Sequence, residues 1–195
     1  AYIDPYYATY PGVVRSASAL PRTVPTRAEN GFLPERSALE AACNGAASLL
    51  INSPNNPTGA VYLRDTLETI AQVIRTNDMW LISDEVYDTQ VWEGSHISPR
   101  SLPGMDDHTL VVGSMSKSHA MTGSRIGWLI GPPEAIACAI DLATNTTYGV
   151  PGYIQDAALF AMEAAGLESE VAAPFLRRRD IVQKVLSTQS IVRSV

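Results

Sequence analysis

Short apolar runs alternate along the chain with longer stretches in which apolar residues recur every three or four positions. Residues 47–52 (ASLLIN), 79–85 (MWLISDE), 109–114 (TLVVGS) and 126–131 (IGWLIG) have the length and composition of buried strands. In residues 63–78, by contrast, one helical face collects Leu63, Leu67, Ile70, Val73 and Ile74. The pattern therefore predicts a strand, an amphipathic helix and a strand in succession.

Further segments predict helices and complete the expected fold. Residues 11–20, 33–44, 132–145, 152–165 and the C-terminal segment have helical patterns, and residues 1–12 resemble the end of a strand that runs into a turn. Alternation of short apolar strands with helices is typical of an α/β fold. We expect a mostly parallel sheet flanked by helices in three layers.

Polar residues follow three of the predicted strands at once. SPNNPTG comes after the first, DEVY follows the apolar part of the second, and SMSK follows residues 109–113. Ligands of parallel sheets bind at the carboxyl ends of the strands, so we expect the three clusters to meet at one pocket. Each cluster also has an ordinary explanation, as a tight turn, an acidic helix start or a solvated lysine.

Composition and charge narrow the possible functions. The chain has 195 residues, of which 46% are hydrophobic, and its mean hydropathy is +0.01, as in soluble globular proteins. The net charge is −6 and the basic residues are scattered apart from 177–179, so we expect no nucleic-acid partner. No apolar run approaches the roughly 20 residues that span a bilayer, and no signal-peptide pattern opens the sequence. We therefore expect no membrane association and a cytoplasmic location.

Four residues are interpreted as parts of the core. Cys43 and Cys138 lie in Ala-rich helical stretches without the spacing of metal ligands, so we expect two buried thiols and no metal site. Trp80 and Trp128 lie in predicted strands, where large aromatic side chains usually pack inside.

The histidines and the arginine run have ordinary interpretations as well. His96 and His108 lie in predicted loops, whereas His119 comes two residues after Lys117 and is either structural or part of a site lining. Residues 177–179 (RRR) are interpreted as one solvated helix face.

Three ordered motifs resemble one enzyme family. NNPTG at 55–59, DEVY at 84–87 and SMSK at 114–117, followed by GSRIG at 123–127, resemble hallmark segments of the pyridoxal-phosphate-dependent aminotransferases of class I/II and fold type I. PYYATYPG at 5–12 and YGVPGYIQDAAL at 148–159 extend the resemblance over nearly the whole chain. It implies a large cofactor-binding domain in residues 1–165, incomplete at both ends, and a helical segment, 166–195, that leads towards a missing small C-terminal domain.

The resemblance assigns Lys117 the central role. Lys117 would bind pyridoxal 5'-phosphate covalently and then move a proton, since a lysine supplies both an amine and a base. Asp84 would pair with the ring nitrogen of the cofactor, because a nearby anion raises the pKa of a cationic acid. Asn56 and Tyr87 would hydrogen-bond the phenolic oxygen of the ring.

The remaining assignments concern the ring face and the phosphate. Tyr7 would stack on the ring, although Tyr6 and Tyr10 lie close to it in the sequence. Arg125 would hold the phosphate as a bidentate partner, helped by the hydroxyls of Ser114 and Ser116. In the same segment, the glycines at 123 and 127 would leave room for close approach of the backbone.

The resemblance implies an enzyme that transfers an amino group from an L-amino acid to a 2-oxo acid, and a homodimer. Two alternatives stay open: a carbon–sulfur β-lyase, which would release pyruvate and ammonia from cystathionine, and a non-catalytic cofactor-binding regulator domain. The arginine that binds the substrate carboxylate in this family, and its phosphate loop, have no counterpart in the sequence. We therefore expect the 195-residue segment by itself to be inactive.

Overall fold

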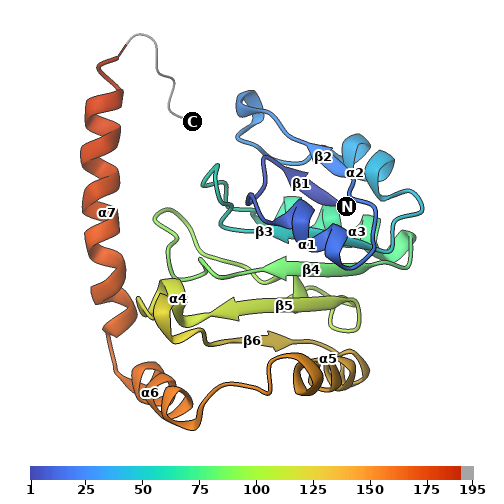
Figure 1. Cartoon of the computed structure of the whole chain (residues 1–195). Helices are drawn as coiled ribbons and strands as arrows, with labels where there is room; N and C mark the ends of the chain where they lie inside the picture. The colour runs from blue at the N-terminus through green and yellow to red at the C-terminus, as the bar shows by residue number, and fades with distance from the viewer. Residues whose placement is uncertain (190–195) are drawn as a thin grey trace.

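The computed structural model describes residues 1–189 and contains a six-stranded sheet with helices around it (Figure 1). In chain order the strands are β1 (Tyr2–Asp4), β2 (Thr23–Pro25), β3 (Ser48–Asn52), β4 (Trp80–Asp84), β5 (Thr109–Ser114) and β6 (Gly127–Ile130). Their order in the sheet is β2-β1-β3-β4-β5-β6, and only β6 runs antiparallel to its neighbour. The expected mostly parallel α/β fold is confirmed.

The helices agree with most of the sequence-based expectations. They are α1 (Tyr10–Ser16), α2 (Arg36–Cys43), α3 (Arg64–Thr76), α4 (Met115–Ser118), α5 (Pro133–Thr146), α6 (Gly152–Glu163) and α7 (Leu167–Leu186), with short 3-10 turns η1 (Ala28–Asn30), η2 (Pro99–Ser101) and η3 (Thr122–Ser124). Strand β2 and helix α4 were not predicted, since each is too short to show a period. The end of the expected C-terminal helical segment, 190–195, lies outside the described residues.

Successive side chains of each strand point to opposite faces of the sheet, and helices cover both faces. Leu49, Ile51 and Leu81 are fully buried in the core formed with α2 and α3. Leu50 and Ile82 point to the opposite face, where they line a cavity together with residues of α1. The sheet is therefore covered by α2 and α3 on one face and by α1 on the other.

Three polar residues end their strands on the α1 face. Asn52 is the register partner of Asp84, and Asp84 is the partner of Val112, so Ser114 lies on the same face two residues further along β5. This carboxyl edge of the sheet faces α4 and α7 (Figure 1). The fold thus brings the ends of β3, β4 and β5 together at one edge.

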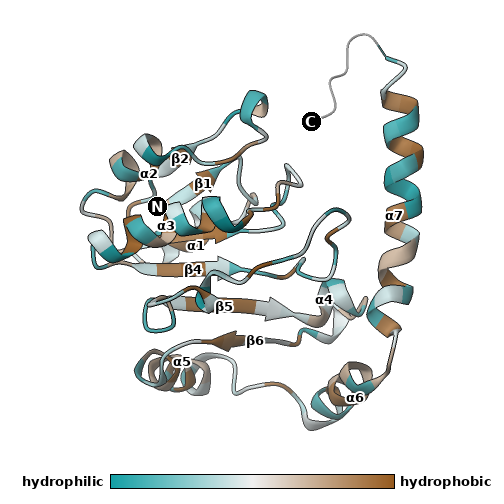
Figure 2. Ribbon diagram, turned by 180° about the vertical axis from the view of Figure 1, so that it is seen from behind, coloured by the Kyte–Doolittle hydropathy of each residue, from teal (hydrophilic) through white to brown (hydrophobic). Residues whose placement is uncertain are grey.

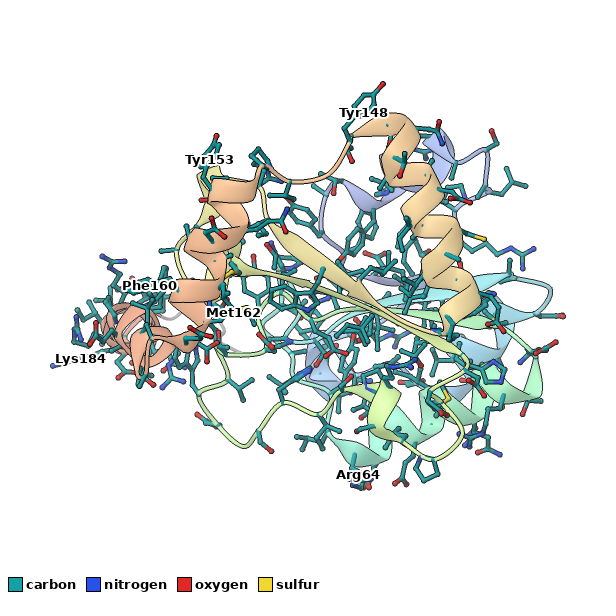
Figure 3. All side chains as sticks on the ribbon, turned by 90° about the horizontal axis from the view of Figure 1, so that it is seen from below. Arg64, Tyr148, Tyr153, Phe160, Met162 and Lys184 are labelled. Atoms are coloured by element: carbon teal, nitrogen blue, oxygen red, sulfur yellow. The ribbon has the colours of Figure 1, made fainter. Side chains whose placement is uncertain are left out.

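Apolar side chains are exposed around β6, α5 and α6. All four residues of β6 are exposed, and the end of the strand is coloured as strongly hydrophobic (Figure 2). Tyr148, Tyr153, Phe160 and Met162 are 61% to 90% exposed, and the side chains of Tyr148 and Tyr153 project outward (Figure 3). This side of the described chain is therefore an apolar surface.

Three of the four residues expected in the core are exposed, so that interpretation is wrong for them. Cys43 is fully buried, but Cys138 is exposed on α5, a helix that buries none of its residues. Trp80 and Trp128 are 40% and 37% exposed. An apolar sequence pattern does not reveal which face is covered: Trp80 begins its strand, and Trp128 lies on the edge strand β6.

None of the helices within residues 1–189 is long and apolar enough to cross a membrane. The same part of the chain contains no group of three His, Cys, Asp or Glu side chains placed to hold a metal ion.

Close packing against a neighbouring strand occurs at Gly127 but not at Gly123, and the expected room for the backbone at a phosphate stays a prediction for both. A Cβ atom added at Gly127 would lie 2.5 Å from the carbonyl oxygen of Gly113, a backbone atom that cannot rotate away. A Cβ atom added at Gly123 would have no neighbour within 4 Å. The absence of a side chain at Gly127 therefore lets β6 pair closely with β5.

We predict that Gly127→Ala lowers the free energy of unfolding by about 1–3 kcal/mol, because the added methyl group forces the two strands apart. Urea denaturation measures the change. Gly123→Ala is the matched control and is expected to stay within about 0.5 kcal/mol of the parent. Equal stability of the two variants would contradict the close packing of β6 on β5.

Candidate active site

A cavity of about 380 Å³ lies at the carboxyl ends of β3, β4 and β5. This volume falls within the range of small-molecule sites, roughly 300–1,000 Å³. Its lining consists of Tyr7, Asn52, Asn56, Asp84, Val86, Tyr87, Ser114, Ser116, Lys117, Thr122 and Arg125. The structure therefore brings together every residue that the resemblance assigns to the cofactor, and their individual roles stay predictions.

Asp84 ends β4 with both carboxylate oxygens engaged. The Tyr10 hydroxyl donates to Oδ2 at 2.6 Å, and the backbone N–H of Val86 donates to Oδ1 at 3.3 Å. Burial and the negative charge of Asp84 raise the pKa of the Tyr10 phenol, so this phenol keeps its proton and remains a donor. Tyr10 was not predicted to contact Asp84, because only the packing of α1 on the sheet brings them together.

Asn52 joins the polar groups at the strand ends into one network. Its Nδ2 donates to the Asp84 carbonyl at 2.9 Å, and its Oδ1 accepts from the Asn56 backbone N–H at 2.7 Å. Asn56 Nδ2 in turn donates to the Tyr87 hydroxyl at 3.4 Å. Asn52 is 2% exposed. Asn52 was not predicted as a site residue, although an Asn at the end of an apolar strand signals a buried amide that needs partners.

The turn after β3 explains the two consecutive asparagines. Asn55 is buried, and its Oδ1 accepts from the Thr58 backbone N–H at 3.2 Å and from the Thr58 hydroxyl at 2.9 Å. Gly59 closes the turn with a φ of +76°, which glycine adopts without strain. Asn55 therefore shapes the turn, and Asn56 is left to reach the cavity.

Lys117 enters the cavity from α4, the single turn that follows β5. The Ser114 hydroxyl accepts from the Ser116 backbone N–H at 3.1 Å and so caps this turn. The Gln90 side chain donates to the Lys117 carbonyl at 3.3 Å. Lys117 Nζ lies 5.9 Å from the centre of the Tyr87 ring, and no carboxylate in residues 1–189 forms a salt bridge with it.

One guanidinium group and two hydroxyls belong to the lining of this cavity. Arg125 has a φ of +52°, and its Nη1 donates to the Thr122 carbonyl at 2.9 Å, which holds the guanidinium group at the lining. The Ser114 and Ser116 hydroxyl oxygens lie 2.9 Å apart in the same lining. A guanidinium group and two hydroxyls in one lining are donors of the kind that bind a phosphate.

Packing distinguishes the three tyrosines near the N-terminus. Tyr7 is 44% exposed and lines the cavity, whereas Tyr10 is buried and Tyr6 packs edge-on against Tyr2 with ring centres 4.8 Å apart. The Tyr7 ring stands edge-on to the Tyr10 ring at 5.8 Å. Of the three, Tyr7 alone presents its ring to the cavity.

His119 does not belong to the cavity lining. It is 8% exposed, its Nδ1 lies 2.8 Å from the Ser118 hydroxyl, and its Nε2 lies 3.7 Å from Glu168 Oε1 at the start of α7. The structural alternative for His119 therefore holds, and the residue connects α4 with α7.

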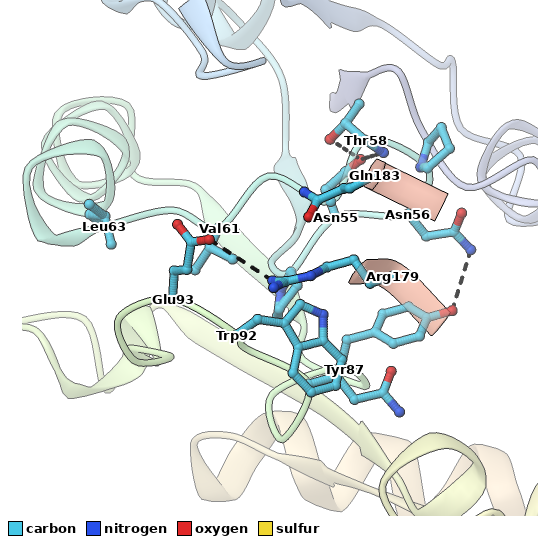
Figure 4. A pocket seen from close by; sticks show the side chains of 14 residues that line it. Asn55, Asn56, Thr58, Val61, Leu63, Tyr87, Trp92, Glu93, Arg179 and Gln183 are labelled. Atoms are coloured by element: carbon cyan, nitrogen blue, oxygen red, sulfur yellow. Dashed lines mark hydrogen bonds and ion pairs between the residues drawn. The ribbon is translucent and has the colours of Figure 1, made fainter. Parts of the chain in front are cut away.

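A second cavity of about 780 Å³ lies beside the first and shares Asn56 and Tyr87 with it (Figure 4). Arg179 reaches into it from α7, beside Trp92, and its Nη1 lies 4.0 Å from Glu93 Oε1. The larger cavity therefore separates α7 from the turn after β3 and from the segment after β4.

The arginine run does not form one solvated face, so that interpretation is wrong. Arg177 and Arg178 are exposed, but Arg179 lines the larger cavity and also pairs with Asp180 at 2.9 Å. Successive residues of a helix are about 100° apart, so three in a row cannot share one side.

The chain matches known proteins over most of its length. It matches the family described as aminotransferase class I and II over residues 1–189. The arginine–pyruvate transaminase of Pseudomonas aeruginosa is 43% identical over 186 residues, which cover 94% of this chain and 47% of that protein. The aspartate/prephenate aminotransferase of Thermus thermophilus is 38% identical over 191 residues, covering 95% and 49%.

Solved structures of aminotransferases have a similar fold. The structure of Thermus thermophilus aspartate aminotransferase with maleate has a TM-score of 0.90 at 33% identity, covering 99% of this chain and 52% of that one. The chain thus spans about half the length of the relatives it matches.

We predict that Tyr10→Phe lowers the free energy of unfolding by about 1.5 kcal/mol or more, because Asp84 loses a hydrogen bond to a charged acceptor. Urea denaturation at pH 7 measures the change. Tyr6→Phe is the matched control, since that ring packs on Tyr2, and it is expected to change the free energy by about 0.5 kcal/mol or less. A loss of equal size in both variants would show that the Tyr10 hydroxyl does not stabilise Asp84.

Proposed function

The chain belongs to the aminotransferases of class I and II, and on that premise we propose that the whole protein transfers an amino group from an L-amino acid to a 2-oxo acid. The observation that carries the proposal is one cavity that gathers Lys117, Asp84 and Arg125. The relatives are named as transaminases or aminotransferases, which supports amino-group transfer. Neither a β-lyase nor a regulator domain gains support from them.

Pyridoxal 5'-phosphate is the cofactor of this family, and the charged groups of the cavity suit its charged parts. We assign the phosphate to Arg125, Ser114 and Ser116, which all belong to the same lining. We assign the ring nitrogen to Asp84, whose carboxylate accepts hydrogen bonds without an ion pair in residues 1–189. The donor set therefore fits an anion at one point and a cationic ring at another.

The remaining lining residues suit the neutral parts of the cofactor. Tyr87 and Asn56 already share a hydrogen bond, and both can turn to the phenolic oxygen of the ring. The half-exposed ring of Tyr7 offers a stacking surface. Lys117 supplies the amine that binds the cofactor covalently.

The residues of the chain then divide the chemical work. When bound, the cofactor ring delocalises the electron pair that remains when an amino acid loses its Cα proton. Lys117 Nζ accepts that proton as a general base and later returns it. The Asp84 carboxylate, oriented by Tyr10, keeps the ring nitrogen protonated.

Domain division, assembly and location are part of the same proposal. We assign residues 1–165 to the cofactor-binding domain and 166–195 to a segment that leads to a second domain. Gly166 has a φ of +83° at the junction, and α7 buries none of its residues, which supports this division. A homodimer is supported by the exposed apolar side chains around α6. A cytoplasmic location is supported by two cysteines that form no disulfide.

We predict that Lys117→Ala lowers the turnover of the whole protein by several orders of magnitude, because the covalent attachment and the base are lost together. Reduction with borohydride followed by peptide mass spectrometry should find the cofactor on Lys117 in the parent protein. Lys184→Ala, on an exposed position of α7 (Figure 3), is the control and should keep parental turnover. Near-normal turnover of Lys117→Ala would refute the assignment.

We predict that Arg125→Ala raises the dissociation constant for pyridoxal phosphate about 30-fold or more, since loss of one member of a charge pair costs about 2 kcal/mol or more. Equilibrium dialysis measures the constant. Arg64→Ala removes an equal charge from an exposed helix (Figure 3) and should leave the constant within about twofold. Similar affinities of both variants would show that Arg125 does not hold the phosphate.

A further inference from the structure

Glu85 follows Asp84 directly, yet it does not line the cavity. Glu85 is 7% exposed. The Ser98 hydroxyl donates to its Oε1 at 2.8 Å, and His96 Nε2 donates to its Oε2 at 2.9 Å. Both oxygens of a buried carboxylate are thus engaged by residues 11 and 13 positions further along the chain.

The cluster of Glu85, His96 and Ser98 fixes the position of the chain more than it stabilises the fold. Burying a carboxylate is costly, and an apolar side chain of similar size would fill the same space without that cost. Hydrogen bonds, unlike apolar contacts, have direction, so the cluster fixes the two ends of residues 85–98 against each other. We name this segment the 85–98 loop. The backbone N–H of Glu85 also donates to the Val112 carbonyl at 2.9 Å, which ties the base of the loop to β5.

The 85–98 loop forms hydrogen bonds with two residues that line the candidate site, Asn56 and Lys117. The Tyr87 hydroxyl accepts from Asn56 Nδ2 at 3.4 Å, and Gln90 Nε2 donates to the Lys117 carbonyl at 3.3 Å. Both contacts are long for hydrogen bonds, whereas the two bonds of Glu85 have ordinary lengths. A small shift of the loop would therefore break the contacts at the cavity first.

Backbone hydrogen bonds also connect Glu85 with Tyr87 and Gln90. Asp88 N–H donates to the Glu85 carbonyl at 3.0 Å, and Gln90 N–H donates to the Tyr87 carbonyl at 2.8 Å. The chain from Glu85 to Gln90 is therefore folded into consecutive turns, and a movement at Glu85 is passed to Tyr87 and Gln90.

We propose that Glu85, together with His96, is a positioning residue of the reaction site, which acts through the 85–98 loop on Tyr87 and Lys117. The inference rests on the proposed function, since both target residues matter there as cofactor-binding groups. Glu85 touches neither the cavity nor a reacting atom, and its role is to set where Tyr87 and Gln90 stand relative to Lys117.

Hydrogen exchange in the cofactor-free whole protein tests the structural half of this inference. Glu85→Ala is expected to speed amide exchange in residues 86–92, whereas Glu85→Gln keeps an acceptor for Ser98 and should stay near the parent. Ser98→Ala removes one of the two bonds and provides the test if Glu85→Ala does not fold. Val73→Ala, in the core on α3, is the control: it lowers stability but should leave exchange in residues 86–92 unchanged. Equal local exchange in the Glu85 and Val73 variants would overturn the inference.

A double-mutant cycle tests the functional half. We expect Glu85→Ala to lower kcat about tenfold, the equivalent of one lost hydrogen bond at the site, with KM changed less than about threefold. Tyr87→Phe should lower kcat in the parent but by less than about twofold more in the Glu85→Ala background, because the tyrosine is already displaced. Effects of the two substitutions that simply multiply would overturn the positioning role.

Different outcomes would contradict the amino-group transfer and the positioning role of Glu85. A Lys117→Ala variant with parental turnover contradicts the proposed function and, with it, the role of Glu85. Normal dependence on Lys117, combined with independent effects of Glu85 and Tyr87, overturns the positioning role alone.

Discussion

One buried amide, that of Asn52, holds together the parts of the protein on which its chemistry depends. It forms hydrogen bonds with the Asp84 carbonyl and the Asn56 backbone N–H. These bonds fix the end of β3 relative to the end of β4 and to the turn after β3. Leaving a buried polar group without a partner costs about 1–3 kcal/mol, which strongly disfavours any other register of these strand ends. The spacing of Asp84 and Asn56 follows from this constraint.

The charges of the cavity are arranged so that each remains open to a ligand. Asp84 is held by neutral donors, Tyr10 and the Val86 backbone N–H, whereas Lys117 and Arg125 come from the segment after β5. Within residues 1–189 no ion pair joins either cation to Asp84. A closed salt bridge would occupy the groups that we assign to a charged cofactor, and the fold instead holds Asp84 at the end of β4 and the two cations in the segment after β5.

Some residues of the candidate site are positioned by strands and others by a loop. The sheet places Asp84 through its register, but Tyr87 and Gln90 are on a loop, where position depends on local anchors. The Glu85 cluster provides such an anchor on the side of β4 that the cavity does not use. This division explains why neighbouring acidic residues, Asp84 and Glu85, have different surroundings.

From the sequence by itself follow most of the strands and helices in their order and the motifs that fall in the candidate site. Apolar periodicity is a local property and predicted the α/β class, whereas the resemblance of three short motifs to one family pointed to Lys117, Asp84 and Arg125. The short strand β2 could not be predicted in the same way, because a strand of three residues shows no period. Burial was misjudged for Trp128 and Cys138, since whether a face is covered depends on residues far away in the chain.

Only the tertiary structure decided which residues meet. Alternation along a strand shows which residues share a face, but the register and the covering helix select the partners, and both arise from packing between distant segments. For that reason the contact of Tyr10 with Asp84 and the choice of Tyr7 for the cavity could not be read from the sequence. The role of Asn52 as a bridge had the same origin, because its two partners come from a neighbouring strand and a turn that only the folded sheet brings within hydrogen-bonding distance.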